Sequence, residues 1–504
     1  MPTFSQLVAE DLTFKSYRKW ISQEDRLYID SRSRNWDFYN RRWVDAVGRH
    51  CSAMCKYFTK NVGEMQSEFE DKHKVTLGVT SQIVKSIVDH IYGLGLSRTF
   101  PDPDGADKAD AEAVKQIEKW VGGQIFFAER MQTMAEVTGT ACVVPRFNER
   151  TRKIQFGLYG GEYVTPWYEL GDVDNLLGFE IEFFQDRMTD SGMKRAAYYE
   201  MWDNRMTPEW PAGHFLVTWG EELLAEGANP YFPLLPMVPF RAEVNPRSWY
   251  GTTPIDAVVD ANIVLNEYLT EFKEIVDFQG FSMLVIKGKV PGEQQISAKR
   301  TIDLIPGGPG LDTDAKYISP GAPLAELLEF IDWWITWTAN QAQVPVGLIN
   351  ATVAKVESGY ALTIRWKPFT SSTARKRRLY SASERDLWEV ALEVARVWSG
   401  TEKGLLVPLN PTPDAADKML LEWNEAVVPT DPKETRDQEQ YDVQMGFVSP
   451  LTIYLKKNPD MSEKDAEQAM IKNIEAQDKL RAMRAVAQAK ILGASAQFAE
   501  RDEQ

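Results

Sequence analysis

The sequence predicts an α+β fold in which a small β-rich module lies between two long helices. Short runs of alternating apolar and polar residues, separated by turn residues, occur between residues 140 and 245 and indicate a mixed or antiparallel sheet. Apolar residues then recur at helical spacing over residues 254–277 and again over 321–343. Between these helices, residues 281–321 are rich in strand-forming residues and glycine. The chain therefore combines a generic α+β region with a helix, β module, helix arrangement.

Composition limits the class of protein. The chain has 504 residues, of which 43% are hydrophobic and 26% charged, as expected for a globular chain of two or more domains. Its 57 basic and 73 acidic residues give a net charge of −16, which excludes a uniformly basic nucleic-acid binder. Local basic patches, or a surface that repels a polyanion, stay possible. We expect no secretory signal, no membrane span and synthesis in a reducing cytoplasm, with Cys51, Cys55 and Cys142 too few for a disulfide framework.

The region before residue 253 is predicted to be mixed α/β. Residues 28–43 lack a regular apolar repeat, so we expect an irregular segment there. Apolar residues at helical spacing over 83–91 predict a helix that Gly93 and Gly95 end. Two further helices, interrupted at Gly122 and Gly123, are expected to lead into a strand at residue 140.

Acidic residues follow both long helices. The first helix, about 24 residues and on the order of 36 Å long, carries Asp256, Asp260, Glu267, Glu271 and Glu274. The second carries Glu326, Glu329 and Asp332, spaced three apart. A solvated helix face and a channel wall that repels a polyanion explain these stripes about equally well.

A short apolar loop, residues 344–358, joins the second helix to a third one over 359–400. Pro345 and Gly347 break the helix. The loop's tip is small and apolar, with one charge, and contains Leu348, Ile349, Asn350, Thr352, Val353 and Lys355. Beyond residue 401 we expect a Pro-rich strand region (LLVPLNPTPD) followed by helices.

Basic residues gather at two places. The β module contains Lys287, Lys289, Lys299 and Arg300, and the third helix contains Arg365, Lys367, Arg375, Lys376, Arg377 and Arg378. We interpret the second group as helix-face charge that pairs with acids of a neighbouring subunit, in preference to a nucleic-acid site.

Signatures of catalysis are weak. The sequence has no G-x-x-x-x-G-K-[ST] phosphate loop and no G-x-S-x-G elbow, and its glycine clusters at 157–161 and 307–310 are interpreted as turns. The His50-Cys51-x-x-x-Cys55 cluster lacks the second half of a zinc site. We predict no catalytic, cofactor or metal site. The alternative is an enzyme built on the 140–245 sheet, with Glu162, Asp172 and Asp174 as candidates.

Several segments, in this order, resemble the portal proteins of tailed double-stranded DNA bacteriophages. They are SQIVKSIVDHIYGLGL, AEVTGTACVVPRF, the helix, β module, helix unit at 254–343, ESGYAL at 357–362 and MGFVSP near the C-terminus. The resemblance implies a wing at 1–253, stem helices at 254–277 and 321–343, a clip at 278–320 and a tunnel loop at 344–358. It further implies a long helix returning to the wing at 359–400, and a C-terminal wing strand and helical crown at 401–504.

The resemblance also implies a function without catalysis or cofactors. Portals form a dodecameric ring at one capsid vertex, around the channel through which double-stranded DNA is packaged and ejected. Implied partners are the terminase large subunit, the major capsid protein, scaffold and a head-completion or tail adaptor protein. The protein would be assembled in the host cytoplasm and reside in the virion. The loop tip and the acids Glu267, Glu271, Glu274, Glu326, Glu329 and Asp332 would line the channel, and Lys287, Lys289, Lys299 and Arg300 would contact the motor or adaptor. Another virion connector or a minor capsid protein is the alternative, ahead of an enzyme.

Overall fold

A computed structural model describes residues 32, 34–40, 77–122, 124–169, 172–189, 192–280, 283–287, 314–318, 324–349, 359–399, 401, 404–424, 432–458, 464–476 and 479. Its contacts divide the chain into two compact units. The first unit comprises Met1–Val356 and Arg365–Val427, and the second comprises Glu357–Ile364 and Val428–Gln504.

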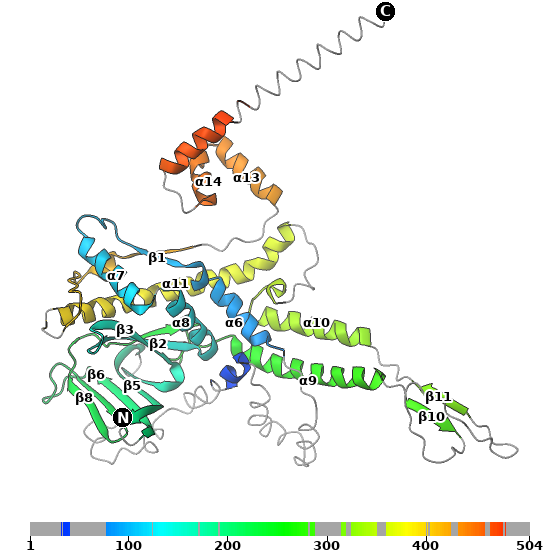
Figure 1. Ribbon diagram of the computed structural model, residues 1–504, viewed down its shortest axis with the longest axis horizontal. Coiled ribbons are helices and arrows are strands. Elements are labelled where there is room, and N and C mark those ends of the chain that lie inside the picture. Colours follow the sequence, from blue (N-terminus) through cyan, green and yellow to red (C-terminus); the bar gives the residue numbers. More distant parts are fainter. Residues whose placement is uncertain are drawn as a thin grey trace, which may run out of the picture. The chain divides into compact units, whose positions relative to one another are not determined.

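The centre of the first unit is a three-stranded antiparallel sheet covered by helices (Figure 1). The strand order is β3-β2-β9, with β2 at Thr140–Asn148, β3 at Lys153–Gly160 and β9 at Val238–Arg241. Helices α6 (Val79–Asp89) and α8 (Gln124–Thr138) pack against each other, α8 contacts β2, and α11 (Gly359–Ser399) runs past them. Ala141 to Val144 of β2 are completely buried, because they lie between helices and neighbouring strands. The strand expected at residue 140 is confirmed.

A second antiparallel sheet, of five strands, follows β3. Its strands are consecutive, in the order β4-β5-β6-β7-β8. They span Val164–Glu169, Asp172–Thr189, Gly192–Asp203, His214–Trp219 and Glu222–Ala228. The region 140–245 thus forms two sheets where the sequence indicated one. The short 3-10 helix η2 (Gly161–Tyr163) separates them, and β9 returns to pair with β2.

The third part of the first unit is the helix, β module, helix arrangement. Helix α9 (Ile255–Gly280) and helix α10 (Leu324–Gln341) lie side by side (Figure 1). Between them in the sequence, β10 (Met283–Lys287) pairs antiparallel with β11 (Asp314–Ile318). The helices differ from their predicted bounds by three residues or fewer at each end.

The remaining elements of this unit include a further helix and a two-stranded antiparallel sheet. Helix α7 (Lys108–Val121) ends at Gly122, whose φ of 93° is left-handed, and α8 follows. The 3-10 helix η1 (Tyr92–Leu94) leads into β1 (Leu96–Thr99), which pairs with β12 (Leu420–Trp423). The strand expected in the Pro-rich stretch LLVPLNPTPD is wrong, since residues 405–413 form no strand. Proline has no N–H to donate to a ladder, and the strand forms instead after α12 (Ala415–Lys418).

The described part of the second unit is helical, as the sequence predicted for the C-terminal region. Helix α13 (Pro432–Gln444) ends before Gly446, whose φ is 73°. Ser449 then accepts a hydrogen bond from the Thr452 N–H and caps α14 (Pro450–Lys457). Residues 464–476 are also helical.

Candidate interaction surface on the two long helices

Helix α9 is buried at one end and exposed at the other. Ile255, Val258, Val259 and Leu265 in its first half are completely buried. Val276, on the same predicted apolar face near the other end, is 40% exposed. The first half of α9 therefore belongs to the core of the unit, and the second half projects from it.

Helix α10 shows the same gradient in the opposite direction. Ile335, Thr338 and Ala339 are buried in its second half, whereas Leu328, near its start, is 50% exposed. Leu328 lies on the same side of the helix as Ile331 and Ile335, so this apolar side is covered at one end of α10 and exposed at the other. Because α10 packs antiparallel to α9, its first half lies beside the exposed half of α9.

Aromatic side chains gather on this pair of helices, and we call them the aromatic cluster: Tyr268, Phe330, Trp333, Trp334 and Trp337. The ring centroids of Tyr268 and Phe330 lie 5.1 Å apart, and those of Trp334 and Trp337 lie 5.3 Å apart. Trp334 donates its Nε1–H to the Ala261 carbonyl at 2.9 Å and is fixed against α9. Trp333 is 55% exposed and Trp337 is 39% exposed. The outer part of the cluster thus presents aromatic surface that the single chain leaves uncovered.

The acids of α10 are exposed on the same helix. Glu326, Glu329 and Asp332 have no ion-pair partner within the described part of the chain. At about 100° per residue, Asp332 lies roughly opposite Phe330 and Trp334 around the helix, whereas Glu326 lies between Trp333 and Trp337. The exposed acids and the exposed tryptophans therefore share one broad face of the helix, with Asp332 at its edge. On α9, Glu267 is half-buried, and Glu271 and Glu274 belong to the helix, but their side chains lie outside the description.

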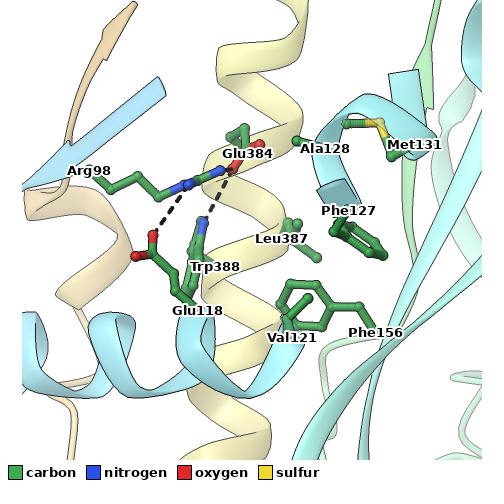
Figure 2. A pocket seen from close by; sticks show the side chains of 10 residues that line it. All are labelled: Arg98, Glu118, Val121, Phe127, Ala128, Met131, Phe156, Glu384, Leu387 and Trp388. Atoms are coloured by element: carbon green, nitrogen blue, oxygen red, sulfur yellow. Dashed lines mark hydrogen bonds and ion pairs between the residues drawn. The ribbon is translucent and has the colours of Figure 1, made fainter. Parts of the chain in front are cut away.

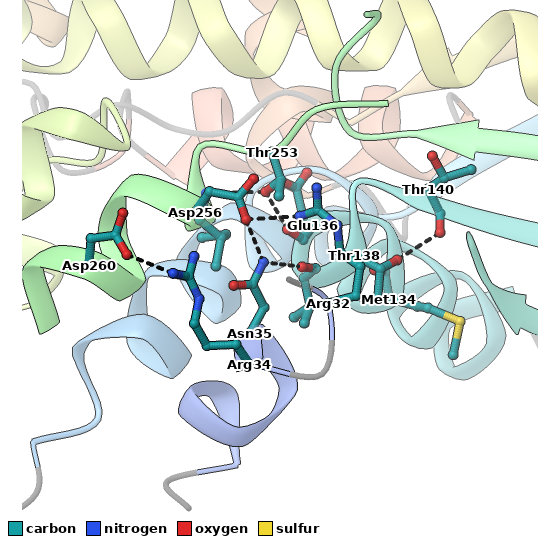
Figure 3. Close-up of polar contacts among 12 residues, drawn as sticks. Arg32, Arg34, Asn35, Met134, Glu136, Thr138, Thr140, Thr253, Asp256 and Asp260 are labelled. Atoms are coloured by element: carbon teal, nitrogen blue, oxygen red, sulfur yellow. Dashed lines mark hydrogen bonds and ion pairs between the residues drawn. The ribbon is translucent and has the colours of Figure 1, made fainter. Parts of the chain in front are cut away.

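The first acids of α9 are not free, in contrast to those of α10. Arg32 pairs with Asp256 and Arg34 pairs with Asp260, each at 2.9 Å (Figure 3). Asn35 bridges the Asp256 carboxylate, at 2.7 Å, and the Val137 carbonyl, at 3.0 Å. The acidic stripe expected along α9 is therefore partly neutralised at its buried end.

The arginines come from a helix that the sequence did not predict. Residues 34–39 are helical, within the segment 28–43 expected to be irregular. Trp36 on this helix donates to Glu162 at 3.2 Å. The prediction was wrong because the helix is short and is held by tertiary contacts, namely the ion pairs, the hydrogen bonds and the buried side chain of Phe38, which leave no regular apolar repeat in the sequence.

Only the beginning of the predicted loop 344–358 is described. Val344 is buried, Leu348 closes the 3-10 helix η3 (Val346–Leu348), and Ile349 follows it. Four of the proposed tip residues lie outside the described residues: Asn350, Thr352, Val353 and Lys355. In the β module, Lys287 is the last residue of β10, and Lys289, Lys299 and Arg300 also lie outside the description.

One residue of the basic run on α11 lies in the interior of the chain and pairs with a buried acid there. Lys376 is 3% exposed, and its Nζ lies 2.7 Å and 2.9 Å from the two carboxylate oxygens of the completely buried Glu136. Tyr380 also donates to Glu136, at 3.2 Å. The prediction that Lys376 pairs with another subunit is wrong, because the partner is in α8 of the same chain. Arg375 lies 3.6 Å from Glu243, and Arg377 donates to the His90 carbonyl.

A second buried network joins α11 to β1 and α7 (Figure 2). Glu384 accepts hydrogen bonds from Arg98, Tyr92 and Trp388, and Arg98 also contacts Glu118 at 3.2 Å. Burial, followed by the charge of Glu384, raises the pKa of Tyr92 well above its ordinary value. The adjoining cavity is about 30 Å³, which is room for about one water molecule. This network is part of the folded core, not a ligand site.

The three acids proposed as candidates for an enzyme each have a different partner and do not form a common site. Glu162 is bound by Trp36, Asp174 pairs with Arg241 at 2.6 Å, and Asp172 accepts from the Asp174 backbone N–H. Among the described residues, no group of three or more His, Cys, Asp or Glu could hold a metal ion. His50, Cys51 and Cys55 lie outside them. In the same part of the chain, no helix is long and apolar enough to cross a membrane.

Of the comparisons with known proteins, the one with solved structures finds similar chains. No family model matches the chain, and no curated protein matches it. The neck of a native GTA particle computed with C12 symmetry has 12% identity, a TM-score of 0.42 and coverage of 74% of this chain and 88% of that chain. The neck of an empty GTA particle computed with C6 symmetry has 14% identity, a TM-score of 0.43 and coverage of 79% and 93%. The virion of a native gene transfer agent particle has 13% identity, a TM-score of 0.40 and coverage of 75% and 89%. Likeness of this degree does not define a function.

Proposed function

We propose that this chain is a portal protein: a structural subunit, without catalytic activity, of a dodecameric ring at one capsid vertex. Double-stranded DNA would pass through the ring during packaging and ejection. The observation that carries the proposal is the projecting half of the α9 and α10 pair, where an exposed aromatic cluster and an unpaired acidic surface lie on one hairpin. The order of segments that resembles portals supports it independently.

Ring formation explains the aromatic cluster. Exposed aromatic patches on a soluble protein mark interaction sites, and copies arranged around an axis would cover Trp333 and Trp337 at every subunit boundary. In a closed ring each subunit presents one surface to the next and another to the previous. The exposed tryptophans of the hairpin supply surface for such a contact.

A DNA channel explains the acids. A wall that carried Glu326, Glu329 and Asp332 from every subunit would repel the phosphate backbone, so that DNA slides and is not held. The loop 344–358 would form a constriction in this channel. The β10–β11 module would meet the terminase large subunit during packaging and a head-completion or tail adaptor afterwards. The rest of the ring would contact the capsid protein and scaffold.

Native mass spectrometry and negative-stain imaging of the purified full chain test the proposal. We expect a closed ring with a central channel and twelve subunits. Trp333→Ser combined with Trp337→Ser should shift the protein toward monomers. Met206→Ser, which removes a more exposed apolar side chain elsewhere, should leave the ring unchanged. A wild-type monomer at every protein and salt concentration would contradict the proposal.

A further inference from the structure

A cavity of about 230 Å³ opens on the first unit, away from the two long helices. Its three walls are the loop Tyr231–Leu234, the C-terminal half of α11, and the segment Pro411–Ala416. Small-molecule sites usually occupy about 300 Å³ or more. The cavity is therefore sized for a single side chain of another protein and is small for a cofactor.

Hydrogen bonds fix both loops that form the walls. Asn229 donates to the Leu234 carbonyl at 2.8 Å, and its Oδ1 accepts from the Tyr231 N–H at 2.9 Å. On the other side, the Thr412 N–H and hydroxyl each donate to the buried Asp110 carboxylate at 2.7 Å. The cavity is thus pre-formed, and a ligand would pay little ordering entropy on entering it.

The lining combines carboxylates with flat apolar surface. Glu389 and Glu393 approach the cavity from α11. Glu393 is already held by Arg396, with contacts of 2.7 Å and 2.9 Å. Glu389 has no ion-pair or hydrogen-bond partner within the described residues and is exposed. Phe232, Pro233, Pro411 and Pro413 supply the apolar surface around it.

No ion pair joins Glu389 to a cation among the described residues, although Arg385 and Arg396 stand on the same helix. Although Glu389 is exposed overall, the cavity wall partly desolvates its carboxyl group; this desolvation, and then the negative charges of Asp386, Asp417 and Glu393, raises its pKa. Arg396, the cation that lines the cavity, is committed to Glu393. A positive group placed beside Glu389 would relieve this repulsion and lower its pKa again.

We infer that this cavity binds an arginine side chain presented by a partner protein. Guanidinium is planar, donates in a fixed fork to carboxylate oxygens and packs its faces on aromatic and apolar surface. Phe232 and the prolines offer such surface, and Glu389 offers the unpaired acceptor. Lysine, a compact and strongly hydrated charge, fits this lining less well. The inference does not depend on the proposed function, because no residue of the helix pair takes part.

Ligand-observed saturation-transfer NMR on the full-length protein tests the inference. The probes are N-acetyl-arginine methylamide, its neutral citrulline isostere and the corresponding lysine amide. We expect the arginine probe to bind, and Glu389→Gln to weaken it by about three- to fivefold, the size expected for a partly exposed charge pair. Glu389→Lys, which places a cation in the cavity, should abolish binding.

Glu209→Gln, the same change at an exposed position outside the cavity, is the matched control and should bind as the wild type does. Binding should also weaken as the pH falls through the raised pKa of Glu389, because protonation removes the acceptor. Equal binding of the arginine and citrulline probes, or no effect of Glu389→Gln, would overturn the inference. Equal binding of the lysine probe would overturn the choice of arginine.

Discussion

The same pair of residues, a glutamate followed four positions later by a tryptophan, occurs in two opposite surroundings. On α11, Glu384 and Trp388 are both buried, and the indole N–H donates to the carboxylate at 3.2 Å. On α10, Glu329 and Trp333 are both exposed. The α11 pair is completed by Arg98 and Tyr92 of the same chain, whereas the described chain provides nothing equivalent for the α10 pair.

This difference distinguishes regions where the chain itself supplies the partners of its charged and aromatic side chains from regions where the described residues do not. In the core formed by α8, α11 and the three-stranded sheet, buried charges are neutralised internally, as Glu136 is by Lys376. On the projecting half of the helix pair, aromatic area and negative charge both stay exposed. We therefore expect substitutions in the core to change the folding of the monomer, and those on the helix pair to change assembly and DNA passage.

The largest effect on folding is expected for Lys376→Met. It leaves the Glu136 carboxylate buried without its cation, which costs about 3–5 kcal/mol of unfolding free energy. Urea unfolding followed by tryptophan fluorescence measures this change. Lys367→Met, at an exposed position of the same helix, is the control and should stay within about 0.5 kcal/mol of the wild type. Equal effects of the two variants would show that Lys376 is not the counter-ion of Glu136.

A smaller effect is expected when the two glutamate–tryptophan pairs are compared directly. Glu384→Gln deprives Arg98 of its buried partner and leaves it with Glu118, at a cost of about 2 kcal/mol. Glu329→Gln removes a charge from an exposed position and should change the unfolding free energy by less than about 0.5 kcal/mol. The comparison fails if both substitutions destabilise the chain equally in urea unfolding.

The acids of α10 should act on DNA and not on stability. In the proposed ring, the triple variant Glu326→Gln, Glu329→Gln and Asp332→Asn removes the repulsion of the channel wall. We expect roughly three- to tenfold more double-stranded DNA to be retained at low salt, with the excess disappearing as salt screens the charges. A filter-binding titration at several salt concentrations measures this. Glu209→Gln serves as a control, and unchanged retention by the triple variant would exclude these acids from the channel wall.

The sequence predicted those elements whose stability comes from a regular apolar repeat. Helices α9 and α10, and the strand β2, have such repeats and were placed within a few residues. Lys376 was misread because it stands in the run ARKRRL, where four consecutive basic residues resemble a solvated helix face. Its burial depends on Glu136, which lies 240 positions away in the sequence. Pairings across such distances leave no local pattern.

The smallest effects are expected for the two ion pairs that Arg32 and Arg34 make with α9, because these pairs differ in burial. The Arg32 side chain is 5% exposed and Asp256 is 39% exposed, whereas Arg34 is 23% and Asp260 65% exposed. Since solvent screens the second pair more, Arg34→Ala should cost no more than about 0.2–1 kcal/mol of unfolding free energy. Arg32→Ala should cost more, about 1–3 kcal/mol, because the Asp256 carboxylate loses a buried donor and keeps only Asn35 among its described donors. Urea unfolding of the two variants gives the order. If Arg34→Ala lowered the unfolding free energy more than Arg32→Ala did, the exposed pair of Arg34 and Asp260 would contribute more to docking on α9 than the buried pair does. The part of α9 that belongs to the core would then end closer to Asp256 than we infer.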